Sequence, residues 1–345
     1  MGLQTSSPAA VIPGVQPKIL IIGCGSIGER HLRCFQRTGR AEPVACEPRA
    51  EVLHRIKTTY NVTGFATLAE AWTGGRYDAV VICAPAQTHI AMTVDCLARG
   101  LNVLIEKPLS ISLDGVAGLQ EAIAESGSFV RVGYTWHFHP GVKALRACLK
   151  RGELGRPLQA VVTSGQHFPT FRPAYREIYY TRHESGGGAI QDSMTHNVNT
   201  VEWLVGPTTR VFCEASHQAL EGVTVEDTVN AVARNGDVLV SYSHNQFQPP
   251  NETTFLVHCE NGSLKFESHE HRWAKWPRGA EGWQYFPATL KERDDMFVAQ
   301  ANDFLDGMLN GTPGDMCTIE EAAQTLKFNL AALESWRTGK AVEIR

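Results

Sequence analysis

The sequence predicts two domains: a doubly wound α/β sheet of parallel strands over residues 17–135, and an α+β domain with a mostly antiparallel sheet over residues 136–345. In the first part, short apolar stretches alternate with helical stretches, which is typical of parallel strands joined by right-handed crossovers. In the second part, stretches of alternating polarity are joined by Asn235-Gly236 and Asn261-Gly262, which are hairpin signals. We expect residues 1–16 to form a flexible tail, because they lack the basic start and apolar core of a signal peptide.

The first strand runs directly into a glycine-rich loop. The apolar run Lys18–Ile22 continues into Gly23-Cys-Gly-Ser-Ile-Gly28, and a helical stretch follows, which is the context of a dinucleotide-binding Rossmann fingerprint. Such glycines allow a tight turn, close approach to a pyrophosphate and close packing of helix on strand, while N–H groups at the helix start attract phosphate charge. A strand-turn-helix without a ligand is the alternative. We expect the cofactor to contact this loop through Gly23, Gly25, Ser26, Ile27 and Gly28.

The second strand ends on an acidic residue. Glu47 follows the stretch that begins at Pro43 and lies nineteen residues after Gly28. A carboxylate at this place accepts hydrogen bonds from the ribose of adenosine and repels the 2′-phosphate of NADP. Arg49, two residues later, is a residue type that receives such a phosphate. The sequence therefore predicts NAD as the cofactor, with NADP left open.

Two later strands end in further candidate residues. After the strand that begins at Asp78, we expect Ala84, Pro85, Thr88 and His89 to contact the cofactor, with Thr88 as the N-cap of the next helix. For His89, a surface position without a ligand is an equal alternative.

The strand at residues 103–105 is followed by Glu106-Lys107-Pro108. Open α/β sheets bind ligands at the carboxyl ends of their strands. We therefore place Glu106 at the cofactor and Lys107 at both cofactor and substrate.

A polar stripe lies between the two regions. Helical spacing puts Asp192, His196 and Asn199 on one side of a helix, and Ile190, Met194, Val198 and Val201 on the other. A carboxylate and an imidazole one turn apart form an acid/base pair if the stripe faces a cleft, and a solvated polar face is the alternative. The Gly186-Gly-Gly188 triplet indicates close backbone approach. The preceding segment supplies further substrate candidates: Tyr175, Arg176 and Tyr179.

Composition excludes several classes of function. A formal net charge of −4 disfavours a nucleic-acid partner, and no apolar run is long enough to span a bilayer. Nine cysteines without a Cys-x-x-Cys pair favour free thiols in a reducing cytoplasm. His137 and His139 would share one face of a strand, but no third ligand is evident, so we expect no metal site.

Taken in order, these motifs resemble the Gfo/Idh/MocA family of NAD(P)-dependent oxidoreductases, from Lys18 to Ile344. The resemblance rests on the glycine loop, on Glu106-Lys107-Pro108, on the segment Asp192–His196, on Gly206 and on the strand entry Glu226-Asp227-Thr228. It implies that Lys107 is the active-site lysine, that His196 transfers the proton and that Asp192 is its neighbour and a substrate ligand. The chain departs from the family at Asn199, where many members have an aspartate. His137 stands where an arginine is common.

The resemblance implies hydride transfer between nicotinamide and a hydroxyl or keto carbon of a sugar, a sugar derivative or a cyclitol. We also expect a homodimer or homotetramer formed through the C-terminal sheet. The alternatives are an NAD-retaining glycosidase of the same family and a non-catalytic dinucleotide-binding sensor. The presence of Lys107, Asp192 and His196 together argues against the sensor.

Overall fold

The computed structural model describes residues 16–345, which fall into two compact units. The first unit contains the chain up to Thr135 together with Glu292–Ile319, and the second contains Trp136–Lys291 and Glu320–Arg345. Residues 1–15 of the expected tail lie outside the described part of the chain.

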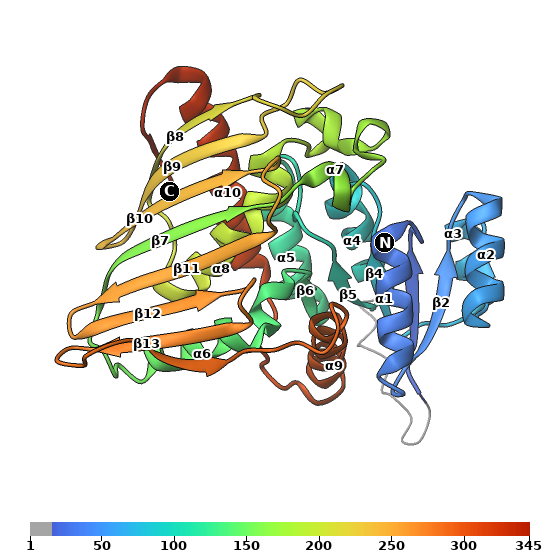
Figure 1. The fold of residues 1–345 in the computed structure, drawn as a ribbon. Helices are drawn as coiled ribbons and strands as arrows, with labels where there is room; N and C mark the ends of the chain where they lie inside the picture. The colour runs from blue at the N-terminus through green and yellow to red at the C-terminus, as the bar shows by residue number, and fades with distance from the viewer. Residues whose placement is uncertain (1–15) are drawn as a thin grey trace. The chain divides into compact units, whose positions relative to one another are not determined.

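The first unit is built on a parallel sheet. In its described part, six strands lie in the order β3-β2-β1-β4-β5-β6, and the order reverses beside β1, as in a doubly wound fold (Figure 1). These strands are mainly apolar because both faces of the sheet are covered; Leu20, for example, is fully buried between Val44 and Val80. The strands are β1 (Lys18–Ile22), β2 (Glu42–Cys46), β3 (Gly64–Phe65), β4 (Ala79–Ile82), β5 (Asn102–Ile105) and β6 (Val130–Val132).

The helices of this unit are α1 (Ser26–Arg37), α2 (Ala50–Tyr60), α3 (Leu68–Gly74), α4 (His89–Ala98), α5 (Val116–Ser126) and α9 (Asp295–Asn310). The domain boundaries predicted from the sequence placed α9 in the second domain. In the structure, Phe304 of α9 packs edge-on against Phe35 of α1, with ring centroids 6.2 Å apart. Asp294 accepts hydrogen bonds from Arg33, with an Nε to Oδ2 distance of 2.5 Å. An amphipathic pattern reveals that a helix covers a core, but not which core it covers.

The second unit is a mostly antiparallel sheet, which confirms the predicted fold class. Within residues 136–291 and 320–345, nine strands lie in the order β14-β13-β12-β11-β7-β10-β9-β8-β15, and β7 with β10 form the parallel pair. The two expected turns join β9 to β10 and β11 to β12. The strands are β7 (Pro157–Gly165), β8 (Arg210–Ser216), β9 (Thr228–Asn235), β10 (Val238–Asn245), β11 (Glu252–Cys259), β12 (Gly262–Glu267), β13 (Arg272–Pro277), β14 (Gln284–Pro287) and β15 (Val342–Glu343).

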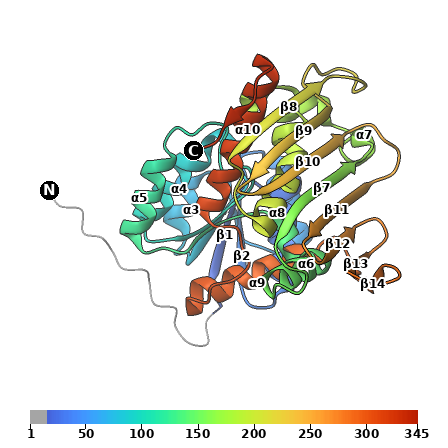
Figure 2. The ribbon, with the colours of Figure 1, turned by 90° about the vertical axis from the view of Figure 1, so that its left-hand side faces the viewer.

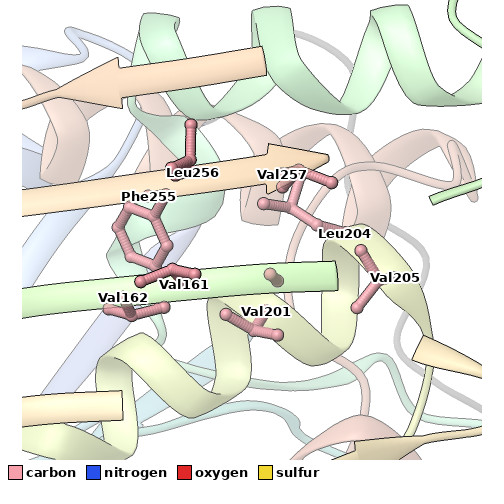
Figure 3. Close-up of a pocket in the computed structure, with 9 residues that line it drawn as sticks. Val161, Val162, Val201, Leu204, Val205, Phe255, Leu256 and Val257 are labelled. Carbon is pink, nitrogen blue, oxygen red and sulfur yellow. The ribbon is translucent and has the colours of Figure 1, made fainter. Parts of the chain in front are cut away.

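Three helices pack on one face of this sheet, as Figure 2 shows: α6 (Pro140–Lys150), α8 (Thr195–Val205) and α10 (Ile319–Thr338). A fourth, short helix is α7 (Phe168–Phe171). An apolar hollow lies where α8 meets β7 and β11, lined by Val162, Val201, Phe255 and their neighbours (Figure 3). It has no room for a water molecule, so it is part of the packed core and not a ligand site.

Two buried histidines belong to this core. His139 is the N-cap of α6, where its Nδ1 accepts a hydrogen bond from the N–H of Gly141 at 3.1 Å. His244 on β10 lies between two serine hydroxyl groups, those of Ser164 and Ser193. Burial lowers the pKa of each imidazole from 6.5 to about 4, so both side chains are neutral at pH 7.

The stability of the protein should therefore fall as the pH falls. Between pH 6.5 and pH 4 the unfolded chain binds protons at His139 and His244 that the folded chain does not bind. The stabilisation of the folded state by the two neutral histidines is complete above pH 6.5 and is lost as the pH approaches 4. From pH 7 to pH 5 each histidine should cost about 2 kcal/mol of unfolding free energy.

Urea unfolding at a series of pH values measures this loss. The variant His139→Asn keeps a good N-cap residue but removes the titrating group, so it should show a shallower loss. An unfolding free energy that stays constant between pH 7 and pH 5 would contradict the prediction.

Candidate functional site

Two glycines of the loop between β1 and α1, Gly23 and Gly28, have no room for a larger residue. A Cβ at Gly28 would overlap the carbonyl oxygen of Gly23, and a Cβ at Gly23 would lie 2.8 Å from the carbonyl oxygen of Cys83. Gly23 also has a φ of +82°, which favours glycine. Within residues 16–345, no side chain caps the first N–H groups of α1, so they remain available to an anion. The loop therefore fits the pyrophosphate of a dinucleotide.

Glu47, directly after β2, is only 2% exposed and has several internal partners. Its Oε2 accepts the N–H of Cys24 at 2.8 Å, and its Oε1 accepts Nε of Arg49 at 2.7 Å. Burial raises the pKa of Glu47, but the hydrogen bonds from Arg49 and Cys24 outweigh it, and the pKa is lowered overall. The carboxylate is thus charged, but a ribose would share it with Arg49.

A cavity of about 390 Å³ lies beside this loop in the first unit. Its charged lining consists of four arginines and one glutamate, and several of the arginines pair with acids, as Arg55 does with Glu29 at 2.8 Å. A wall of this composition suits the phosphate groups and the ribose of a nucleotide. The residues that line it are Cys24, Gly25, Ser26, Glu29, Arg30, Arg33, Arg49, Val52 and Arg55.

The turn after β4 is fixed to the turn after β5 by His89. This side chain is 1% exposed, and its Nδ1 and Nε2 each lie 2.9 Å from a backbone carbonyl oxygen, of Pro108 and Ala84 respectively. Burial lowers the pKa of His89, and a neutral ring donates to one of the two carbonyls at a time. The surface alternative for His89 is therefore wrong, while contact with the cofactor stays a prediction.

Thr88 is the residue before α4, as expected, but its hydroxyl does not cap the helix. It donates to the carbonyl of Pro85 at 2.7 Å and closes the turn that holds Ala84 and Pro85.

Glu106 and Lys107 follow the carboxyl end of β5 and have different environments. Glu106 is 6% exposed; its Oε1 lies 2.6 Å from Nε2 of His31, and its Oε2 accepts the N–H of Lys107 at 3.1 Å. Lys107 is partly buried at the same edge of the sheet. The geometry makes Glu106 a support for the lysine segment. Sequence reasoning missed His31, although a histidine beside the buried Leu32 and Phe35 of α1 was a visible signal.

In the second unit, Asp192 lies in a single turn of π-helix, Ile190–Met194, which precedes α8. Asp192 and His196 are partly exposed, whereas Ile190, Met194 and Val198 are buried, as the sequence predicted. Asn199 does not share their exposure: it is 2% exposed, and its Nδ2 donates to Oγ1 of Thr325 on α10 at 3.1 Å. The expected three-residue stripe is therefore wrong at Asn199, because α10 covers this side of α8 and buries the amide against Thr325.

The aromatic segment before this turn brings one of its three candidates to Asp192. The hydroxyl of Tyr179 donates to Oδ1 of Asp192 at 2.6 Å. Tyr175 is buried, and its hydroxyl donates to the carbonyl of Glu221 at 2.6 Å. Arg176 donates to the same carbonyl through Nε at 2.8 Å. The substrate roles of Tyr175, Arg176 and Tyr179 all stay predictions, and Tyr179 has the geometry closest to the proposed acid/base pair.

The glycine triplet has a structural explanation within the protein. A Cβ at Gly187 would overlap the backbone carbonyl of Tyr180, and a Cβ at Gly188 would overlap the carboxylate of Glu226. The close backbone approach that the sequence indicated is thus made by the chain itself. The sequence analysis did not identify Glu226 or the buried His244 as neighbours of this segment.

Within residues 16–345, no helix combines the length and apolar character needed to cross a membrane. Nor does this part of the chain place three or more His, Cys, Asp or Glu side chains where they could hold a metal ion.

Comparison with known proteins gives two domain matches and several relatives. The description "Oxidoreductase family, NAD-binding Rossmann fold" matches residues 17–134, and "GFO/IDH/MocA C-terminal domain" matches residues 142–265. The 1,5-anhydro-D-fructose reductase of Ensifer adhaerens is 27% identical over 272 residues, which are 77% of this chain and 80% of that protein. The inositol 2-dehydrogenase of Burkholderia multivorans is 30% identical over 198 residues, 55% of this chain and 54% of that protein.

Solved structures agree in fold. Levoglucosan dehydrogenase, in complex with NADH and levoglucosan, is similar with a TM-score of 0.85 at 18% identity, covering 96% of this chain and 100% of that one. An oxidoreductase from Agrobacterium radiobacter, in complex with NAD+, L-tartaric acid and magnesium, has a TM-score of 0.85 at 16% identity, covering 96% of this chain and 99% of that one. With both of its domains matched, the chain belongs to the GFO/IDH/MocA family of oxidoreductases, and its N-terminal domain is an NAD-binding Rossmann fold.

Proposed function

We propose that this oxidoreductase transfers a hydride between the nicotinamide of NAD and a hydroxyl or keto carbon of a sugar, a sugar derivative or a cyclitol. The observation that supports it best is the hydrogen bond from Tyr179 to Asp192, four residues before His196, in a chain with an NAD-binding domain. The names of two relatives specify a sugar derivative and a cyclitol. We place the reaction in the cytoplasm, because all nine cysteines are free thiols.

In this proposal residues 17–135 bind the dinucleotide and residues 136–345 bind the substrate. When bound, NAD supplies the hydride acceptor. His196 takes the proton from the reacting hydroxyl, and Asp192, which accepts a hydrogen bond from the hydroxyl of Tyr179, orients the substrate. The ammonium group of Lys107 binds the reacting oxygen and stabilises the negative charge that forms on it.

The catalytic assignment predicts a loss of turnover without a loss of cofactor. In His196→Ala, kcat should fall roughly 10²- to 10⁴-fold, the usual contribution of general acid-base catalysis, and NAD affinity should stay unchanged. Lys107→Met should have a similar effect. A panel of sugars and cyclitols, monitored for reduced nicotinamide and for released aglycone, identifies the substrate. Calorimetry then measures NAD binding to each variant.

The control is His217→Ala, since His217 is an exposed histidine of the same unit. Near-normal turnover in His196→Ala, or loss of its fold in a thermal melt, would refute the assignment. Release of an aglycone without net reduction of NAD would instead indicate the NAD-retaining glycosidase.

The carboxylate of Glu47 should decide the choice between NAD and NADP. We expect NAD to bind more tightly, because the charged Glu47 repels a 2′-phosphate. Glu47→Gln removes that charge and releases Arg49, so NADP affinity should rise roughly tenfold, the value of one charged hydrogen bond. Calorimetry with both cofactors measures the ratio. If wild-type protein binds NADP at least as tightly as NAD, Arg49 decides the preference, and Arg49→Ala should then lower NADP affinity alone.

We also propose a homodimer or homotetramer formed through the outer face of the nine-stranded sheet. Large apolar side chains are exposed on this face: Val232 is 57%, Leu239 50% and Phe212 39% exposed. Val232 and Phe212 are cross-strand partners, and Leu239 pairs with Arg234, which lies on the same face of β9 as Val232. Large exposed apolar side chains on one face of a sheet are typical of a protein interface.

Light scattering should therefore give a mass of two or four chains. Val232→Arg places a charge at the centre of the proposed interface and should shift the mass toward one chain. Leu113→Arg, at an exposed apolar residue of the first unit, is the matched control and should leave the mass unchanged. A wild-type mass of one chain at micromolar concentration would rule out this oligomer.

A further inference from the structure

We propose that Glu226 and His244 are positioning residues that hold the π turn Ile190–Met194 and thereby aim Asp192 and His196. The inference rests on the proposed function, because it takes Asp192 and His196 as the residues that act on the substrate. Both positioning residues are buried, and neither was assigned a role above.

Glu226 holds the start of the turn. It is fully buried just before β9, and its Oε1 accepts the N–H of Ile190 at 2.8 Å. Its own backbone carbonyl accepts the N–H of Ala189 at 2.9 Å. Ala189 has no polar side chain that could cap the turn itself. A residue remote in sequence therefore supplies the cap.

The second carboxylate oxygen of Glu226 is also occupied. Its Oε2 lies 2.6 Å from Nε2 of His183, so each oxygen of the buried carboxylate has a partner. Gly188 makes this arrangement possible, because it has a φ of +87° and any Cβ there would overlap the carboxylate. In the triplet Gly186–Gly188, the third glycine is therefore required because the carboxylate of Glu226 occupies the space of a Cβ.

His244 holds the middle of the turn through Ser193, the residue after Asp192. Its Nε2 lies 2.6 Å from Oγ of Ser193, and its Nδ1 lies 2.7 Å from Oγ of Ser164 on β7. Because the imidazole is neutral at pH 7, one of its nitrogens donates and the other accepts. The ring therefore connects the turn to the centre of the sheet.

Further hydrogen bonds make this connection stiff. Nε2 of Gln246 donates to Oγ of Ser193 at 2.8 Å, and the hydroxyl of Tyr180 donates to Oε1 of Gln246. Nδ2 of Asn197 donates to Oγ of Ser164 at 2.8 Å. Every member is a buried or partly buried group with a partner, which is the condition for a polar network to fix one conformation.

Fixing the conformation of this turn affects catalysis, because a π turn contains one more residue than an α turn. If the turn relaxed to α-helix, the direction of the Asp192 side chain relative to His196 would change. A misplacement of about 1 Å at the reacting groups already costs roughly 10²-fold in rate. Glu226 and His244 therefore act on the reaction through the orientation of Asp192.

The test compares Glu226→Ala with Glu226→Gln in the full chain with NAD bound. We expect Glu226→Ala to speed amide hydrogen exchange in residues 189–196, to lower kcat roughly 10- to 100-fold and to leave NAD affinity unchanged. Glu226→Gln keeps an oxygen that accepts the N–H of Ile190, so exchange and kcat should stay within about threefold of the wild type. Ser193→Ala removes the link to His244 and should reproduce the effect of Glu226→Ala more weakly.

Asp227→Asn is the matched control. Asp227 is a fully buried carboxylate next in sequence, but it accepts the N–H groups of Gln218, Ala219 and Leu220 and not those of the π turn. This variant should lower the thermal midpoint without faster exchange in residues 189–196.

Three outcomes overturn the proposal: unchanged exchange in Glu226→Ala, a Gln variant as impaired as the Ala variant, or faster exchange with normal kcat while His196→Ala is inactive. If Glu226→Ala does not fold, Ser193→Ala decides, and normal exchange there overturns the proposal. If His196→Ala itself keeps turnover, the proposed function fails, and the exchange data still decide whether Glu226 and His244 hold the turn.

Discussion

A carboxylate is costly to bury unless each of its oxygens has a partner. This chain buries a glutamate beside each of three candidate site segments, and each glutamate accepts at least one backbone N–H and faces one basic side chain. Glu47 accepts the N–H of Cys24 and pairs with Arg49. Glu106 accepts the N–H of Lys107 and faces His31, and Glu226 accepts the N–H of Ile190 and faces His183. The glycine loop, the lysine segment and the π turn are therefore each held in place by a hydrogen bond from their backbone to a buried glutamate.

The fold of the first unit could be predicted well because its sequence signals are local. Apolar strands, glycines without room for a Cβ and the residues at strand ends are local signals, and the parallel sheet places those ends along one edge. Gly23, Gly28 and Lys107 could therefore be placed without a structure. The partners of the glutamates are remote in sequence: His31 lies 75 residues from Glu106, and His183 lies 43 residues from Glu226. No periodicity reveals such pairs.

The prediction for the second unit failed where the exposure of a residue depends on a helix from another part of the chain. A spacing of 3.6 residues places Asn199 with Asp192 and His196, but α10 covers Asn199, whose Nδ2 donates to Oγ1 of Thr325. The triplet Gly186–Gly188 correctly indicated a close approach. Its cause, the carboxylate of Glu226 and the carbonyl of Tyr180, is a tertiary contact.

The first unit is discontinuous in sequence, and this affects how the chain is made. Residues 16–135 leave Phe35 and Phe129 without the cover that Phe304 of α9 provides. Synthesis proceeds from the N-terminus at about 5–20 residues per second. The rings of Phe35 and Phe129 therefore stay uncovered until α9, more than 150 residues after Phe129, has been synthesised. The nascent chain therefore has an apolar surface that a chaperone can recognise. For the same reason, a fragment that ends at Thr135 lacks part of its own core.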